Sequence, residues 1–423
     1  MKSIMDKMID WMTNVLAPKL SKVTQNPWVQ ALQESFQIIM PFILLGSIMS
    51  LVKNLRGIEA LAWLPYSDTV SNFTFGLMGL MVVFLIPYLV LRKKGFDSQS
   101  TIAGFTGLAC YLIFCMPSTT DAGLTAFAGS FSASGLFVSI IVGMVSAALL
   151  LPFLRHKLVK DDGVIPTYIA NWFNTLIPVA IAVVASTALV EAAHVDLFAF
   201  LSTVLAPVLT LGQSYLGFLL SYFVMIFLFA FGVNAWAVAA VVVPIWNMGI
   251  QSNIDAVAAG MAPTAINTTE VIFNGWLNIG GLGCTLPLVI FALISTSRRL
   301  KAVGRAVAVP AIFNINEPTI YGMPIAWNPL LMIPFIINAA VAPTIVWFAL
   351  SAGMCNIPSQ LYQMSFLPTG INAFFVSNDI RGVVLWLVVF LVTAAIYYPF
   401  WKAYERQELE KERAAETETT AAA

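Results

Sequence analysis

The sequence is poor in charged residues, and this scarcity excludes several classes of protein. Only 10% of its 423 residues are charged, whereas a soluble domain carries about 25%. A soluble enzyme, a nucleic-acid-binding protein and a disordered chain are therefore excluded. The 21 basic and 21 acidic residues also cancel, so net charge gives no reason to expect a polyanionic partner.

Histidine and cysteine are equally scarce. Two histidines, His156 and His194, are too few for a histidine-rich metal site, and we interpret both as solvated loop residues. The four cysteines are scattered through apolar sequence and form no C-x-x-C pair. This pattern indicates neither a disulfide framework nor a metal clip. We expect no metal and no cofactor.

The chain is instead rich in apolar sequence. Its hydrophobic content is 59% and its mean hydropathy is +0.85. Because a charge at bilayer depth costs at least ~2.5 kcal/mol, charged residues delimit the stretches that can cross a membrane. We predict an all-α polytopic membrane protein with about ten transmembrane helices. The predicted spans lie near 27–52, 73–92, 99–116, 132–154, 174–193, 215–232, 234–250, 281–297, 327–350 and 382–402.

Lysine and arginine clusters predict the orientation of these spans. Ten crossings place the clusters before the first span and after the second, fourth, eighth and tenth on one side of the membrane. The loops at 117–131, 251–280 and 351–380 contain no lysine or arginine and fall on the other side. By the positive-inside rule, the N- and C-termini are predicted to be cytoplasmic.

The spans and charges divide the chain into four parts. Residues 1–26 carry apolar side chains at helical spacing between Lys and Asp, which predicts an amphipathic helix in the membrane interface. Residues 27–195 form an N-terminal half with five spans, and 196–403 form a C-terminal half. Residues 404–423 are charged and then Ala/Thr-rich, so we expect a disordered cytoplasmic tail.

A single acidic residue, Glu317, lies in an apolar segment broken by prolines and glycines. It is the only charged residue between Ala306 and Asn378. Irregular backbone at membrane depth is tolerated only where protein or a water-filled cavity covers it. We therefore expect a re-entrant hairpin with Asn314, Asn316 and Glu317 near its tip, where they suit a neutral polyol. The alternative is that Glu317 only caps the N-terminus of a half-helix, but intramembrane carboxylates are more often functional.

Two further segments interrupt the apolar pattern. Within 268–285, Gly280 and Gly281 permit a close backbone approach, although such glycines can equally serve tight helix packing. Within 231–246, Asn234 begins an apolar half-span. Trp236 follows it and is a candidate to stack on a ligand, although tryptophan is enriched at membrane interfaces regardless.

The run from STSRRLKAVGR through IFNINEPTIYGMPIAWNPLLMIPF resembles the signature of the membrane (IIC) component of bacterial sugar phosphotransferase systems (PTS), lactose/cellobiose family. The N-I-N-E-P motif with its downstream N-P is the most specific part. The early IIMPFILLGSIMSL and the late IYYPFWKAYERQE match the family in the corresponding places. The resemblance therefore covers nearly the whole chain.

The resemblance implies a permease in the bacterial cell membrane, with ten transmembrane helices and two re-entrant hairpins. It implies a homodimer formed by the N-terminal half and a disaccharide of the cellobiose, lactose or chitobiose type held by the C-terminal half. A separate IIB component, which works with IIA and is phosphorylated on cysteine, would phosphorylate the bound sugar. The resemblance gives Glu317 the catalytic position and makes Asn316, Gly280 and Gly281 lining residues.

One position departs from the family pattern. The typical G-[IV]-H-G is Gly232-Val233-Asn234-Ala235 here. The resemblance therefore places Asn234 beside the sugar, where it can hydrogen-bond a hydroxyl but cannot carry a proton at neutral pH as the histidine can. A non-phosphorylating facilitator or a membrane sugar sensor therefore remains an alternative. An ion-coupled transporter is disfavoured, because proton relays need several intramembrane acids or histidines. Besides Glu317 we identify only Glu34, one to two turns into the first span, where it can snorkel to the interface.

Overall fold

The computed structural model describes residues 25–56, 59–115, 130–132, 135–156, 159, 166–231, 235–326, 328–365 and 367–422. The described residues form helices joined by turns and contain no strand, which confirms the all-α class. Within this described part of the chain, five helices are long and apolar enough to cross a membrane. They are Asp97–Cys115, Leu136–Arg155, Tyr168–Ala192, Pro329–Ser351 and Ile380–Ala415. The ten crossings and the re-entrant hairpins stay predictions.

The N-terminal group of helices packs around α5. Short apolar side chains recur along α5 at i, i+4 spacing (Met78, Val82, Ile86 and Val90), and all four are buried. This face lets α5 pack against α3, α6 and α8. The elements of this group are α3 (Pro27–Leu55), η2 (Glu59–Leu61), α4 (Asp68–Asn72), η3 (Phe75–Leu77), α5 (Met78–Lys93), α6 (Asp97–Cys115), α8 (Leu136–Arg155), α9 (Thr167–Thr187), η5 (Ala188–Ala192) and α10 (Leu197–Gly212).

The C-terminal group has its own core, which contains the fully buried side chains of Tyr222, Trp276 and Phe335. Within it α16 packs against both α11 and α18, and α13 packs against α14. Its elements are α11 (Tyr215–Ala230), α12 (Ala235–Ala258), η6 (Glu270–Gly275), α13 (Leu286–Leu293), α14 (Arg298–Ile312), α15 (Glu317–Gly322), α16 (Pro329–Ser351), α17 (Thr369–Ser377) and α18 (Ile380–Ala422).

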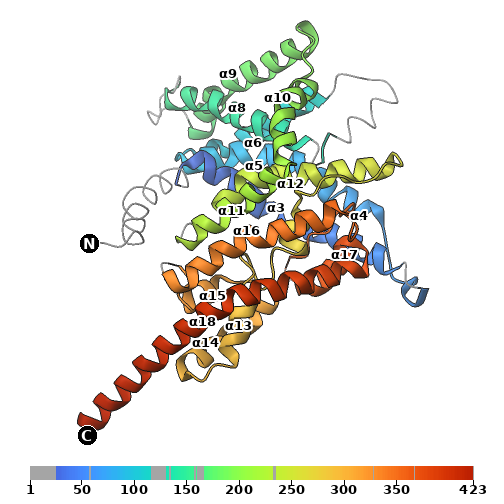
Figure 1. The fold of residues 1–423 in the computed structure, drawn as a ribbon. Coiled ribbons are helices and arrows are strands. Elements are labelled where there is room, and N and C mark those ends of the chain that lie inside the picture. The colour runs from blue at the N-terminus through green and yellow to red at the C-terminus, as the bar shows by residue number, and fades with distance from the viewer. Residues whose placement is uncertain are drawn as a thin grey trace.

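The two groups meet where α12 packs against α3. In Figure 1 these two helices lie in the middle of the molecule, between α8 and α9 on one side and α13 to α18 on the other. The contact matters for function because it places side chains from both halves of the chain around one pocket.

The span expected at 281–297 is wrong as a continuous helix. The helix in this region, α13, has 8 residues and begins only at Leu286. The chain before it turns through Gly280, Gly281 and Gly283, whose φ values are +72°, +105° and +81°. An α-helix requires negative φ, so this glycine cluster makes a tight turn where the apolar pattern alone suggested a helix.

The disordered tail expected at 404–423 is also wrong. The last helix, α18, continues to Ala422, and its end projects from the body of the molecule (Figure 1). The side chains of Glu405 and Glu408 are buried against the start of α14. These contacts stabilise a segment whose composition alone indicated disorder. The amphipathic helix predicted at 1–26 lies outside the described residues, apart from Gln25 and Asn26.

Candidate functional site

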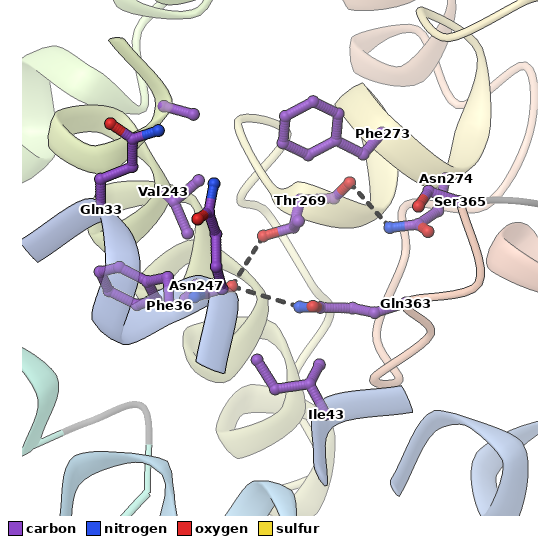
Figure 2. A pocket seen from close by; sticks show the side chains of 12 residues that line it. Gln33, Phe36, Ile43, Val243, Asn247, Thr269, Phe273, Asn274, Gln363 and Ser365 are labelled. Carbon is purple, nitrogen blue, oxygen red and sulfur yellow. Dashed lines mark hydrogen bonds between the residues drawn. The ribbon is translucent and has the colours of Figure 1, made fainter. Parts of the chain in front are cut away.

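A largely apolar pocket opens between the two groups of helices, with an empty volume of about 670 Å³ that includes space at its mouth. Its walls come from α3, α12, the turn at η6 and the loop between α16 and α17 (Figure 2). Concave, largely apolar sites with a few polar groups are where small-molecule ligands usually bind. The lining residues are Gln33, Phe36, Gln37, Ile43, Ala239, Val243, Asn247, Thr269, Phe273, Asn274, Gln363 and Ser365.

Helical spacing explains why α12 presents one face to this pocket. Ala239, Val243 and Asn247 are spaced four residues apart, so they lie on one side of the helix. On α3, Gln33 and Gln37 follow the same spacing. Each helix therefore brings apolar side chains together with one or two amide groups to the pocket wall.

The polar groups of the pocket form a network around Asn247. Its Oδ1 atom accepts hydrogen bonds from Thr269 Oγ1 at 2.7 Å and from Gln363 Nε2 at 3.3 Å. Asn274 Nδ2 donates to the Thr269 carbonyl at 3.1 Å, and Asn274 Oδ1 is buried without a hydrogen-bond partner. These contacts join α12, the η6 turn and the loop (Figure 2), and they leave a buried acceptor beside the cavity.

The chemical character of the lining is neutral. None of the lining residues is charged, and amide and hydroxyl groups supply the hydrogen-bonding capacity. Phe36 and Phe273 add aromatic rings from opposite halves of the chain. The pocket therefore suits an uncharged ligand that presents both hydroxyl groups and apolar faces.

The glycine turn and the N-I-N-E-P turn, which the sequence singled out separately, lie in contact. The Gly280 amide donates to Asn314 Oδ1 at 3.1 Å, and Asn316 Nδ2 donates to the Leu282 carbonyl at 2.6 Å. A Cβ atom placed on Gly281 would lie 2.3 Å from the Cβ of Asn316. Since no real Cβ atom tolerates that distance, glycine is required here, and the expected close backbone approach is confirmed.

The two asparagines of this turn bind backbone groups and do not line the pocket. Asn314 Nδ2 donates to the carbonyls of Ser365 at 2.7 Å and Leu367 at 2.6 Å. Asn316 is buried, with 3% of its surface exposed. Both residues brace the turns next to the pocket, and their direct contact with a ligand stays a prediction.

Glu317 lies at the first position of α15 and is exposed. It does not line the pocket, and its exposed neighbours Phe313, Ile315 and Tyr321 are apolar. This position fits the helix-capping alternative, because an acidic side chain is favourable at a helix N-terminus. The geometry of the pocket therefore does not test the catalytic role expected for Glu317, which stays a prediction.

The other two predicted site residues, Asn234 and Trp236, flank Ala235 in the sequence, where α12 begins. Asn234 lies outside the described residues, and Trp236 is described only as part of the first turn of α12. Ala239 and Val243, further along the same helix, line the pocket. The half-span that the sequence singled out thus contributes Ala239 and Val243 to the pocket.

Sequence reasoning missed Glu270, a second acid in the C-terminal half. Its side chain is fully buried, its Oε1 atom accepts a hydrogen bond from the Tyr362 amide at 3.2 Å, and its Oε2 atom has no hydrogen-bond partner. The sequence does set Glu270 apart, because it is the only charged residue of 268–285. Its position in a predicted external loop, however, gave no reason to expect burial. Glu34, by contrast, forms an ion pair with Lys93 at 2.5 Å, as its place near a span end suggested.

Comparisons with known proteins agree with this architecture. Residues 33–339 match the family described as "Phosphotransferase system, EIIC". The chain is 31% identical to the lichenan permease IIC component of Bacillus subtilis (strain 168), over 99% of this chain and 98% of that protein. It is 27% identical to the lactose-specific EIICB component of Lacticaseibacillus casei, over 95% of this chain and 72% of that protein.

A solved structure shows the same fold. The transporter ChbC, the IIC component of the N,N'-diacetylchitobiose-specific phosphotransferase system, matches with a TM-score of 0.83 and 27% identity, over 95% of this chain and 99% of that chain. The all-helical fold, the apolar helices and the N-I-N-E-P turn therefore have one explanation. The chain belongs to the phosphotransferase system EIIC family and is a membrane-embedded sugar permease, a IIC component of the lactose/cellobiose type.

Proposed function

We propose that the pocket between α3, α12, η6 and the loop binds a disaccharide of the cellobiose, lactose or chitobiose type. The observation that carries this proposal is the neutral lining, in which amide and hydroxyl groups lie beside Phe36 and Phe273. Sugar hydroxyls need both donors and acceptors, and the apolar faces of sugar rings pack on aromatic rings. Two of the relatives are named for disaccharides, lactose and N,N'-diacetylchitobiose.

The same neutral lining gives transport a direction. Phosphorylation by a separate IIB component, which works with IIA, would add a charged group to the bound sugar. None of the lining residues carries a positive charge, and burying an unpaired charge is strongly unfavourable. The sugar phosphate is therefore expelled to the cytoplasm and does not bind again.

We assign the phosphorylation step to the turn that bears Glu317. Asn314, three residues before Glu317, binds the carbonyl of Ser365, and Ser365 lines the pocket. This contact puts the N-I-N-E-P turn next to the pocket wall, while the exposure of Glu317 leaves its carboxylate accessible to a docked protein. In this proposal the bound sugar extends from the pocket to this turn, where Glu317 accepts the proton of its hydroxyl as the phosphoryl group transfers from the IIB cysteine sulfur to the sugar oxygen.

The N-terminal half is proposed to form a homodimer, with both termini in the cytoplasm. The support is α9, one of the least buried of the candidate membrane helices, with 28% of its apolar window covered. A helix with this much exposed apolar surface needs lipid or a second subunit against it. Its exposed large side chains are Tyr168, Trp172, Phe173, Leu176, Ile177, Ile181 and Val184.

A binding and phosphorylation assay tests the proposal. Purified protein is incubated with labelled cellobiose, lactose and N,N'-diacetylchitobiose, with and without phosphorylated IIB. At least one sugar should bind, Asn247→Ala should weaken its binding about tenfold, and phosphorylated IIB should convert it to sugar phosphate. Asn338→Ala is the matched control, because Asn338 is equally buried but bonds Thr393 between α16 and α18. If none of the sugars binds the wild-type protein, or if Asn247→Ala binds as tightly as wild type, the pocket assignment is wrong.

A second candidate function is a facilitator or sensor that binds sugar without phosphorylating it. The observation that favours it is Asn234, which stands where the family has histidine. General acid–base assistance is worth about 10²–10⁴-fold in rate. A gain in phosphorylation of that size in Asn234→His would identify a degenerate site. An unchanged rate would show that the permease phosphorylates its sugar without an imidazole.

A further inference from the structure

The described residues of the loop that forms one wall of the pocket contain no helix or strand, yet hydrogen bonds fix this loop at several points. Residues 362–367 contribute Gln363 and Ser365 to the pocket. Asn314 Nδ2 binds the carbonyls of Ser365 and Leu367. From α17, Asn372 Nδ2 binds the carbonyls of Met364 at 3.0 Å and Leu367 at 2.8 Å. The wall is thus shaped by side chains that do not themselves line the pocket.

Glu270 supplies the fixed point at the start of this loop. Its Oε1 atom accepts the hydrogen bond of the Tyr362 amide at 3.2 Å, directly before Gln363. The Tyr362 hydroxyl, in turn, donates to Asn372 Oδ1 at 2.6 Å. Glu270 also follows Thr269, which lines the pocket and bonds Asn247. One carboxylate therefore joins the η6 turn to the loop immediately behind the pocket network.

Burying the Glu270 side chain is unfavourable for the stability of the fold. Its side chain is 0% exposed, and no ion pair to it occurs in the described part of the chain. Its Oε2 atom meets no hydrogen-bond partner. A buried polar group without full hydrogen bonding destabilises the fold. An apolar side chain of the same size would pack here without that cost but would offer nothing to the Tyr362 amide.

We infer that Glu270 is a positioning residue for the sugar site. It holds Tyr362, and through it Gln363 and Ser365, in the conformation that completes the pocket wall. The group required is a hydrogen-bond acceptor on the η6 turn, whether or not it carries a charge. The part of this inference that concerns sugar rests on the proposed function, whereas the part that concerns the loop does not.

A thiol-labelling experiment tests the loop directly. Ser365→Cys puts a reactive thiol on the pocket wall, and the four native cysteines are buried and should label slowly. Glu270→Met fills the same space without an acceptor, so the Tyr362 amide loses its partner and the loop loosens. Cys labelling at 365 should then accelerate at least tenfold. Glu270→Gln retains an acceptor, and its labelling rate should stay within about twofold of the parent.

Sugar binding provides the second readout. Glu270→Met should weaken the sugar at least tenfold, Glu270→Gln should restore most of that affinity, and the Asn338→Ala control should bind as the wild type does. Unchanged labelling in Glu270→Met would overturn the inference, and so would an equal acceleration in Glu270→Met and Glu270→Gln. If Glu270→Met does not fold, Glu270→Gln against Glu270→Ala gives the same comparison. If no sugar binds the wild-type protein, the proposed function fails, while the labelling result still decides the role of Glu270.

Discussion

The amide of Gly280 donates a hydrogen bond to Asn314 Oδ1 at 3.1 Å, across 34 residues of sequence. The other end of the same side chain, Nδ2, binds the carbonyls of Ser365 and Leu367. Asn314 thus connects the glycine turn, the N-I-N-E-P turn and the loop that lines the pocket. Its backbone also adopts a φ of 60°, a left-handed conformation that asparagine tolerates better than most residues.

We expect Asn314→Gly to release this junction without straining the backbone. Glycine accommodates the positive φ, so the change removes only the three hydrogen bonds, each worth about 0.5–1.5 kcal/mol. Sugar affinity should fall about tenfold and the melting temperature should drop. Asn378→Gly is the matched control, because Asn378 also has a left-handed φ, of 47°, and does not line the pocket. Equal sugar affinity in both variants would show that the junction does not shape the pocket.

Glu317→Gln should separate sugar binding from phosphoryl transfer. Because the Glu317 side chain is exposed and does not line the pocket, sugar affinity should change less than threefold. Loss of the proposed proton acceptor should lower IIB-dependent phosphorylation and uptake at least tenfold. The measurement is sugar phosphate formed per minute at saturating sugar, with Glu410→Gln on the distal part of α18 as control. Phosphorylation near the wild-type rate would assign Glu317 to helix capping alone.

The C-terminal end of α18 should contribute to stability through Glu412. Its carboxylate accepts hydrogen bonds from Ser297 Oγ at 2.7 Å and from the Arg299 amide at 2.9 Å, at the first turn of α14. Loss of a capping interaction of this kind costs about 1 kcal/mol. Glu412→Ala should therefore lower the melting temperature of the purified protein. Glu410→Ala removes only an i,i+4 ion pair with Arg406. It should lower the melting temperature by less than half as much as Glu412→Ala does.

A pH dependence is expected at Asp379, which precedes α18. The hydrogen bond from the Arg381 side chain lowers the pKa of the Asp379 carboxyl below its usual 3.8. The backbone amides of Arg381 at 2.9 Å and Asn356 at 3.3 Å are further donors. A lowered pKa means that the ionised group stabilises the fold above about pH 4, and that this contribution is lost as the pH falls through the folded-state pKa.

Asp379→Asn should therefore melt at most about 2 °C below wild type between pH 5 and pH 8. The difference should shrink as the pH falls below the usual carboxyl pKa of 3.8, and it should vanish once the pH is below the lowered folded-state pKa. Thermal melts across this pH range measure it. Asp255→Asn serves as control, since its carboxylate accepts from the neutral Gln251. A difference that grows as the pH falls would contradict the assigned role of Asp379.

The sequence alone was sufficient to predict those features that depend on local chemistry. The scarcity of charge predicted an all-α membrane protein, because backbone groups inside a bilayer must be satisfied within helices. The N-I-N-E-P run indicated the family, which the comparisons confirm. The glycines at 280 and 281 indicated either a close backbone approach or tight helix packing, and the structure shows a close approach, of Gly281 to Asn316.

Burial and distant contacts were decided only by the tertiary structure. The pocket joins side chains from α3, α12, η6 and the 362–367 loop, and no motif in the sequence links these four segments. Glu270 and Glu317 are each isolated acids in apolar sequence, yet one is fully buried behind the pocket and the other is exposed. The tail became helix because Glu405, Glu408 and Glu412 find partners more than 100 residues away. Such contacts depend on how helices pack, and a linear pattern of charge and hydrophobicity carries no information about that packing.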